Sequence, residues 1–250
     1  MLSDGLRIWR STLKQSAVWS TVVWSLVFLL LIVLILSAVG AGTLASSFYH
    51  PTFPTATPLV SPAPGRALAG VGVMYLVLLA AGPFFVAGLY GLYGQAVAGE
   101  MITWRSFWSY AVRFYGRAWG FYLFLFLWMI ALSIVGGLLV VALHVVGGLL
   151  AAAAFVLSLP WMIRMTGGLF VDRLTWGESF RRMFQGRHYG GLLGGLFLAA
   201  VVYVLLWVMA LALIKAAGAL GIILYFAIVL GLSVAGPLWG FALYRAASTS

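Results

Sequence analysis

Six long apolar segments dominate this chain, and each has enough residues to cross about 30 Å of hydrocarbon at 1.5 Å of helix rise per residue. They cover residues 18–40, 68–97, 118–142, 146–171, 190–214 and 219–244. A strand of a membrane barrel would alternate apolar and polar side chains, and these segments do not. The sequence therefore predicts an all-α membrane protein with six transmembrane helices.

The composition supports this class of protein. Hydrophobic residues make up 64% of the chain and charged residues 7%, with a mean hydropathy of +1.13, which a water-soluble domain could not carry on its surface. The stretches between the segments are too short to fold alone, so residues 1–250 are predicted to form a single integral membrane domain. The first segment also resembles a signal peptide, but its apolar core from Val22 to Leu36 is long, which favours a retained helix.

The charged residues predict an orientation. All but two of the 14 Lys and Arg residues, Arg66 and Lys215, fall on one side of the predicted spans. The positive-inside rule then places both termini in the cytoplasm, in a bacterial inner (plasma) membrane. All four acidic residues share that side, and the basic segments are interleaved with Trp and Phe. The net charge of +10 therefore indicates contact with the anionic lipids of the bilayer, and no nucleic-acid partner is expected.

A weak internal repeat runs through the chain. Each even-numbered segment carries a proline followed by small residues and an aromatic, and Leu89-Tyr90 follows Pro83 at the offset at which Leu243-Tyr244 follows Pro237. The pattern predicts three tandem parallel helical hairpins, in units of about 3–98, 99–172 and 173–245, with a Pro/Thr-rich extracytoplasmic loop at 41–66. The residues predicted to break or shape the returning helices are Pro83, Pro160, Pro237, Gly82, Gly88, Gly167 and Gly236.

Each odd-numbered segment is preceded by basic and aromatic residues. Their spacing is typical of short amphipathic helices lying in the cytoplasmic interface, with extension of the next span as the alternative. Thr175 and Glu178 have the spacing of a capping box, and Thr103 is a candidate cap for the second helix. The interfacial residues are Trp9, Arg10, Trp104, Arg105, Trp108, Arg113, Trp176, Arg181 and Arg182.

Polar groups that could perform chemistry within the membrane are few. His50, His144 and His188 fall on different sides of the predicted spans, and the chain has no cysteine, so no metal site is predicted. Paired carboxylates and nucleophile or phosphate-loop motifs are missing from the sequence, so neither an enzyme nor a cofactor is expected. Arg164 lies inside a span, four residues after Pro160. It is a candidate contact for an anion or a lipid, although snorkelling of its long side chain to the interface is the favoured interpretation.

Three stretches resemble known membrane families. GPFFVAGLYGLYGQAVAGEMITWRSFWSYAVRFYGRAWGF, from Gly82 to Phe121, is similar to the central signature of the bacterial YesL-like membrane proteins. LTWGESFRRMFQGRHYGGLLGGLFL and GPLWGFALYR more weakly resemble the six-span membrane domain of glycerophosphodiester phosphodiesterases. The resemblance covers about residues 70–245. It implies at most an association with sugar uptake, and it carries over no catalytic residue, because the phosphodiesterase chemistry sits in a soluble domain.

Three functions are compatible with these features. The leading hypothesis is a non-enzymatic, transport-associated accessory or scaffolding subunit with a membrane-protein partner. The alternative is a transporter or channel for a small or amphipathic solute, which would need a polar-lined cavity reaching Arg164. The third is a lipid-binding protein, which would have acyl-sized grooves beside Arg164 or beside the interfacial helices.

Overall fold

The computed structural model describes residues 1–48 and 64–249, and it describes the side chains of these residues except at 35–48, 64–78, 213, 215–217 and 219. Every element in this part of the chain is a helix. The helices are α1 (Leu2–Leu13), α2 (Ser16–Phe48), α3 (Pro64–Val97), α4 (Ser106–Phe170), α5 (Trp176–Met183) and α6 (Tyr189–Thr249). The predicted loop at 41–66 lies mostly outside the described residues; its flanks, 41–48 and 64–66, belong to α2 and α3.

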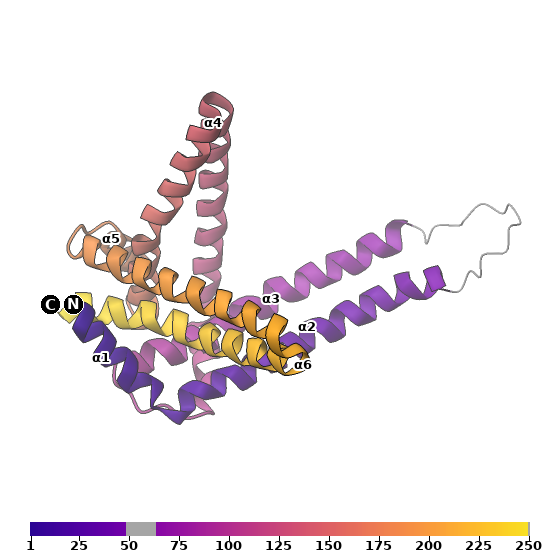
Figure 1. The fold of residues 1–250 in the computed structure, drawn as a ribbon, viewed down its shortest axis with the longest axis horizontal. Coiled ribbons are helices and arrows are strands. Elements are labelled where there is room, and N and C mark those ends of the chain that lie inside the picture. The colour runs from indigo at the N-terminus through magenta and orange to yellow at the C-terminus, as the bar shows by residue number, and fades with distance from the viewer. Residues whose placement is uncertain (49–63, 250) are drawn as a thin grey trace, which may run out of the picture.

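Two of the helices fold back on themselves. The backbone of α4 leaves the helical region at His144 (φ 51°, ψ −123°), and that of α6 does so at Gly218 (φ 54°, ψ −123°). Figure 1 shows each helix as two arms that run in opposite directions from its kink. Glycine adopts the positive φ at position 218 without steric strain. His144 adopts a similar φ, which is energetically unfavourable for a residue with a Cβ atom. The two kinks fall between predicted segments three and four and between five and six.

The described side chains form one packed region, which we call the base. It contains α1, α5, the beginning of α4 and the ends of α3, α4 and α6, and both termini lie there (Figure 1). Its core is aromatic and apolar, with Tyr93, Phe114, Phe170 and Leu238 almost fully buried. Helix α1 is held along α6 because Trp9 Nε1 donates to the carbonyl oxygen of Ala235 at 3.1 Å.

The arms of α2–α3, α4 and α6 leave the base in different directions (Figure 1). Their surfaces are apolar, and Val145 near the kink of α4 is 79% exposed. Among the described residues, four stretches are long and apolar enough to cross a membrane: Ser16–Leu34, Ser106–Phe170, Tyr189–Ala212 and Leu220–Thr249. The chain is therefore an all-helical protein with several membrane-spanning candidates, and the apolar faces of the arms suit a lipid environment.

The segments predicted to lie in the interface differ from one another. Helix α1 is separated from α2 at Lys14–Gln15, and α5 ends before α6 begins, so these two are helices in their own right. The second is an extension of the following span, because α4 continues from Ser106 without interruption up to its kink at His144. Its predicted cap is wrong: Arg105 occupies the N-cap position, and Thr103 donates its N–H to Ser106 Oγ at 3.0 Å. Trp104 and Arg105 precede the helix.

The three prolines lie inside helices. Pro83 is inside α3, Pro160 inside α4 and Pro237 inside α6, and the non-helical backbone angles of α4 and α6 occur at His144 and Gly218 instead. A proline removes one backbone donor from a helix, but the remaining hydrogen bonds can carry the helix through that position. The points of reversal are thus at the far ends of the arms, away from the prolines.

Candidate functional site

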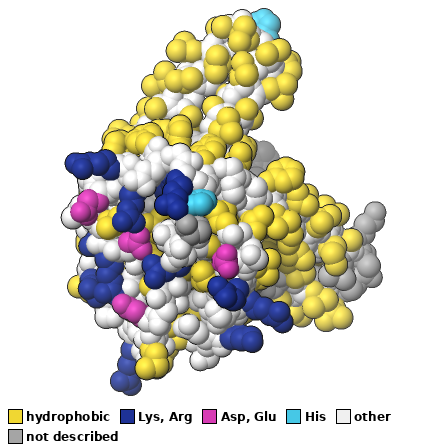
Figure 2. All heavy atoms as spheres, turned by 90° about the vertical axis from the view of Figure 1, so that its left-hand side faces the viewer, with side chains coloured by type: hydrophobic (Ala, Val, Ile, Leu, Met, Phe, Trp, Pro, Cys, Tyr) yellow, Lys and Arg dark blue, Asp and Glu magenta, His cyan; other side chains and the backbone are white. Residues whose placement is uncertain are grey.

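A polar pocket of about 290 Å³ opens at the base, beside the end of α4. Three elements build it: the last turns of α4, the end of α5 with the turn into α6, and the last turns of α6. Its lining is rich in basic side chains, and Figure 2 shows dark blue Lys and Arg side chains gathered over this end of the molecule. The lining residues are Arg164, Arg182, Gln185, Arg187, His188, Tyr244, Ala247 and Ser248.

Glycine lets α4 and α6 approach closely behind the pocket. A Cβ atom at Gly167 would lie 2.1 Å from Cγ of Tyr244, and a Cβ atom at Gly168 would lie 2.9 Å from Ser179 Oγ on α5. Both glycines are buried. The small residues at the end of α4 therefore allow the ring of Tyr244 and helix α5 to pack directly on its backbone, which brings the three walls together.

Arg164 contributes a cation to the wall of the pocket. The residue is 6% exposed, and its guanidinium group makes no hydrogen bond or ion pair within the described ranges. Among the described residues Ser179 Oγ is the fully buried side-chain polar atom without a partner, so the nitrogens of Arg164 reach the open space of the pocket. Charged groups that line a cavity in a membrane protein often mark a binding site or an ion path. The hypothesis of an anion or lipid contact at Arg164 therefore has a pocket to which it can be applied, and snorkelling of the side chain towards the mouth of that pocket stays an alternative.

Arg182 is a second cation in the wall, and it is held in place. Its Nη1 donates to Asp172 Oδ2 at 2.6 Å and to the Tyr244 hydroxyl at 3.3 Å. The hydrogen bond with Tyr244, together with the nearby Asp172 carboxylate, raises the pKa of Arg182 above its ordinary value. This guanidinium group stays charged at any physiological pH.

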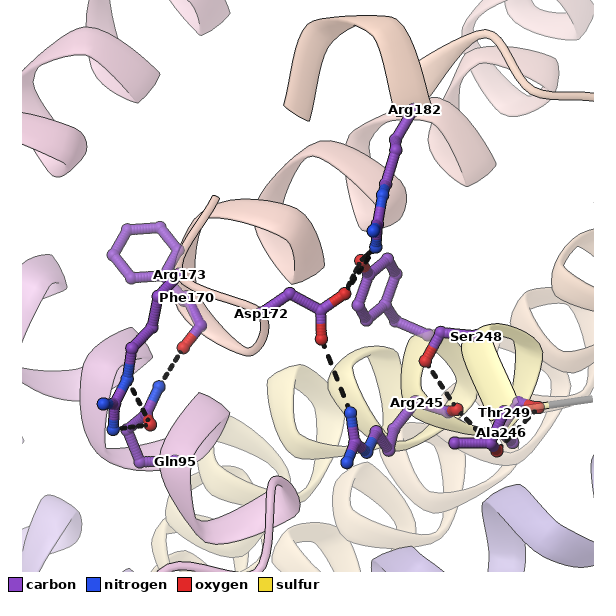
Figure 3. A network of polar contacts seen from close by, with 10 residues as sticks. Gln95, Phe170, Asp172, Arg173, Arg182, Arg245, Ala246, Ser248 and Thr249 are labelled. Atoms are coloured by element: carbon purple, nitrogen blue, oxygen red, sulfur yellow. Dashed lines mark hydrogen bonds and ion pairs between the residues drawn. The ribbon is translucent and has the colours of Figure 1, made fainter. Parts of the chain in front are cut away.

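Asp172 organises the polar side chains behind the pocket. Its carboxylate accepts from the Tyr244 hydroxyl at 2.7 Å and from Arg245 Nη1 at 3.5 Å, in addition to Arg182 (Figure 3). Asp172 thus connects the end of α4 to α5 and α6. One carboxylate, that of Asp172, faces the guanidinium groups of Arg182 and Arg245. Arg164 and Arg187 also line the pocket. The pocket therefore has an excess of positive charge.

A second polar network joins α3 to the end of α4. The Gln95 amide donates to the carbonyl oxygen of Phe170, and Arg173 Nε donates to Gln95 Oε1 at 2.8 Å (Figure 3). Arg173 also forms an ion pair with Glu100, and it does so from a backbone with a φ of 56°. Arg117 adds hydrogen bonds to the carbonyl oxygens of Leu169 (3.1 Å) and Arg173 (3.0 Å). This network is structural, because its polar groups are directed at one another.

The structure brings together only two of the basic residues singled out in the sequence, Arg164 and Arg182. Arg181, the neighbour of Arg182 on α5, is exposed and outside the pocket lining. Arg10 is exposed on α1, and Arg105 lies over the ring of Trp104, with 5.3 Å between Cζ and the ring centroid. Arg113 lies 6.0 Å from the centroid of Phe114.

The singled-out tryptophans lie in contacts away from the pocket. Trp9 packs edge-on against Trp239, with 5.9 Å between ring centroids, and Trp108 packs edge-on against Trp24 at 5.1 Å. The ring of Trp176 packs on Gly120, where an added Cβ atom would lie 2.5 Å from the ring. These residues anchor α1, α4 and α5 to their neighbours.

The other glycines of the repeat have unequal surroundings. A Cβ atom at Gly88 would lie 2.5 Å from the ring of Phe107, one at Gly82 would lie 3.6 Å from the Tyr122 hydroxyl, and one at Gly236 would meet no atom within 4 Å. Gly88 is therefore required for packing, whereas Gly236 faces open space. The repeat does not give these positions one common role.

Sequence reasoning missed Asp172 and Gln95 as partners. Gln95 is an isolated amide near the end of the long apolar helix α3 and is 1% exposed. A polar residue in such a segment indicates a buried hydrogen-bond partner, and this was the signal that the sequence offered. In the sequence Asp172 stands out only as one of the four acidic residues on the predicted cytoplasmic side. The His, Asp and Glu side chains that the structure describes form no group of three that could hold a metal ion.

No protein-family model, curated protein or solved structure matches this chain.

Proposed function

We propose that this chain is a non-enzymatic, six-span inner-membrane protein whose cytoplasmic base binds an anion of the phosphate class. In this topology α2 with α3, the two arms of α4 and the two arms of α6 form three two-span hairpins. The kinks at His144 and Gly218 support it. The charged side chains that the structure describes belong to the base, where they gather in Figure 2, and this agrees with cytoplasmic termini.

The observation that carries the binding proposal is Arg164. The guanidinium group of Arg164, which makes no hydrogen bond or ion pair among the described residues, lines a pocket with two further arginines, Arg182 and Arg187. The planar fork of arginine matches phosphate oxygens in a bidentate geometry, and a bound anion would offset the desolvation of the cation. Gln185, Tyr244 and Ser248 add neutral polar groups to the lining. Together these groups favour a compact oxyanion over a neutral solute.

A transporter for the same anion would need a polar path beyond Arg164. The core that packs against the end of α4 is apolar and aromatic. Its buried residues include Phe114, Leu169, Phe170 and Leu238. This packing favours binding at a site that is open on one side. The transport hypothesis therefore ranks below binding.

The accessory or scaffolding role is the second candidate. The arms diverge from the base and expose apolar side chains along most of their length (Figure 1), which gives a partner membrane protein surfaces to cover. The predicted membership in the YesL-like family stays a prediction and would agree with this role. Anion binding at the base and assembly along the arms use different parts of the molecule and are compatible.

The binding proposal is tested with the purified full-length chain in amphipol. Titration with glycerol 3-phosphate, followed by calorimetry, is expected to show saturable binding. Arg164→Gln is expected to weaken it at least about tenfold, since a hydrogen-bonded charge pair is lost. Arg181→Gln removes an exposed charge from the neighbouring face of α5 and should leave the affinity unchanged. Equal binding by the wild type and Arg164→Gln, or no binding by either, would refute the proposal.

A further inference from the structure

Helix α1 has one apolar face and one basic face. The apolar face packs on α6, where Trp9 Nε1 donates to the carbonyl oxygen of Ala235 at 3.1 Å. A Cβ atom at Gly5 would lie 3.2 Å from Leu243 Cδ2. This packing leaves the polar face of α1 open, which is the arrangement of an amphipathic helix at a membrane interface. The exposed residues of that face are Ser3, Arg7, Arg10, Ser11 and Lys14.

An apolar groove of about 210 Å³ lies between α1 and the two arms of α6. Leu6 and Trp9 of α1 form one wall, and residues of both candidate spans of α6 form the other. The two indole N–H groups in the lining are already hydrogen-bonded: Trp9 donates to α6 as described, and Trp239 Nε1 donates to the carbonyl oxygen of Gly195 at 3.0 Å. The groove therefore suits an apolar occupant. Its α6 wall includes Leu198, Val202, Tyr203, Leu232, Gly236 and Trp239.

A polar hollow on the surface of α1 adjoins this groove, and Leu6 lines both. Arg10 follows Leu6 by four residues and Lys14 follows Arg10 by four, so these side chains are successive neighbours along one face of the helix. Arg7 pairs with Asp4 at 3.3 Å, whereas the side chains of Arg10 and Lys14 form no hydrogen bond or ion pair among the described residues. The apolar groove thus lies beside two exposed cations that are open to a ligand.

We infer that this site binds one anionic phospholipid, with an acyl chain in the groove between α1 and α6 and the phosphate beside Arg10 and Lys14. Charge complementarity selects the headgroup, and the apolar lining selects the chain. A soluble anion would leave the groove empty, and a zwitterionic phospholipid would bring no net negative charge to the two cations. The site goes beyond the proposed phosphate pocket, whose lining contains no residue of α1.

The test maps where photoactivatable lipids react with the full-length wild type. The protein is reconstituted into phosphatidylcholine vesicles that contain a small fraction of diazirine-labelled phosphatidylglycerol or diazirine-labelled phosphatidylcholine, and cross-linked peptides are identified by mass spectrometry. At segments 198–203 and 232–239, phosphatidylglycerol is expected to label at least about fivefold more, because one basic residue near an anionic lipid is worth about that factor. The segment 138–149 of α4 contains no Lys or Arg, so both lipids should label it equally.

The contribution of the two cations is tested by a double variant. Arg10→Gln combined with Lys14→Gln is expected to remove the preference for phosphatidylglycerol at the groove. The matched control combines Arg105→Gln with Arg181→Gln, which removes two other exposed cations, and it should retain the preference. A preference that persists in the Arg10→Gln, Lys14→Gln variant would overturn the inference.

Occupation of the groove is tested at Gly236, where an added Cβ atom would meet no atom within 4 Å. Gly236→Leu places a side chain in the groove and is expected to reduce labelling there by phosphatidylglycerol to the level of segment 138–149. Gly231→Leu is the matched control, because Gly231 lies in the same arm of α6, is equally open and does not line the groove. Undiminished labelling in Gly236→Leu would contradict an acyl chain in the groove.

The wild type alone decides the question if a variant does not fold. Equal labelling of the groove by the two lipids, or no labelling by either, would overturn the inference. None of these results depends on the binding of glycerol 3-phosphate at Arg164. Failure of the proposed function would therefore leave this inference standing, and the reverse also holds.

Discussion

Gly167 and Tyr244 are in direct contact across α4 and α6, so that a Cβ atom at Gly167 would lie 2.1 Å from Cγ of the tyrosine ring. Tyr244 is 4% exposed and its hydroxyl donates to Asp172 at 2.7 Å. The ring cannot withdraw without breaking that hydrogen bond. The contact therefore sets the distance between two walls of the basic pocket.

Gly167→Ala is expected to destabilise the protein by about 1–3 kcal/mol, the usual cost of overpacking a core. Thermal unfolding in detergent, followed by circular dichroism, measures the change. The matched control is Gly116→Ala in the same helix, where a Cβ atom would meet nothing within 4 Å. That variant should be neutral or slightly stabilising, because alanine favours a helix interior over glycine. A neutral Gly167→Ala variant would contradict the described contact.

Gln95 and Arg173 are expected to be energetically coupled. Gln95→Leu removes the donor to the Phe170 carbonyl and the acceptor for Arg173, and leaving buried polar groups unpaired costs about 1–3 kcal/mol. A double-mutant cycle with Arg173→Leu should give a coupling free energy of about 0.5–3 kcal/mol in denaturant unfolding. Additive effects of the two substitutions would mean that the hydrogen bonds between these side chains contribute nothing to the packing of α3 on α4.

The capping box of α5 predicts a dependence of stability on pH. Thr175 donates its N–H to Glu178 Oε2 at 3.0 Å, and Glu178 donates its N–H to Thr175 Oγ1 at 3.4 Å. The first of these hydrogen bonds, with the Thr175 hydroxyl and the nearby Arg182 and Arg181, lowers the pKa of Glu178 below its ordinary value. The stabilisation by the carboxylate is therefore complete above the unfolded-state pKa of about 4.3 and is lost as the pH falls through the lower folded-state pKa.

This dependence is measured as the difference in thermal midpoint between the wild type and Glu178→Gln. The wild type should be the more stable protein at pH 7, and the difference should shrink as the pH is lowered below 5. Asp4 in the first turn of α1 takes part in no capping box, so Asp4→Asn serves as a control for general charge effects. A difference that is constant from pH 7 to pH 3 would show that ionisation of Glu178 does not stabilise α5.

The proposed topology can be tested by labelling, because the chain contains no cysteine. Single cysteines replace His144 and Leu220, near the two kinks, and Ser248 at the base; all three residues are exposed. A membrane-impermeant maleimide is expected to label positions 144 and 220 from outside intact spheroplasts and to label position 248 only after permeabilisation. Labelling of 144 and 248 from the same side would refute the three-hairpin arrangement.

Much of the architecture could be predicted because it depends on local sequence. The length of the apolar segments predicts helices, and the predicted ends near residues 97 and 171 agree with the ends of α3 at Val97 and α4 at Phe170. The capping box of Thr175 and Glu178 is present as predicted, since both of its hydrogen bonds join residues three apart. The effect of the prolines could not be predicted in the same way. A proline removes one backbone N–H donor, and whether the helix continues past it depends on contacts with neighbouring helices.

The sequence by itself determined that this is an all-helical protein with apolar helices of membrane-spanning length, and it marked Arg164 as an unusual cation among them. Only the tertiary structure decided that Arg164 is buried beside Arg182 while Arg181 points away, and that Asp172 and Tyr244 stand behind them. The reason is physical: helix formation and transfer into hydrocarbon depend on residues a few positions apart. The pocket instead depends on contacts between α4, α5 and α6, where the absence of one Cβ atom at Gly167 sets how closely the helices approach.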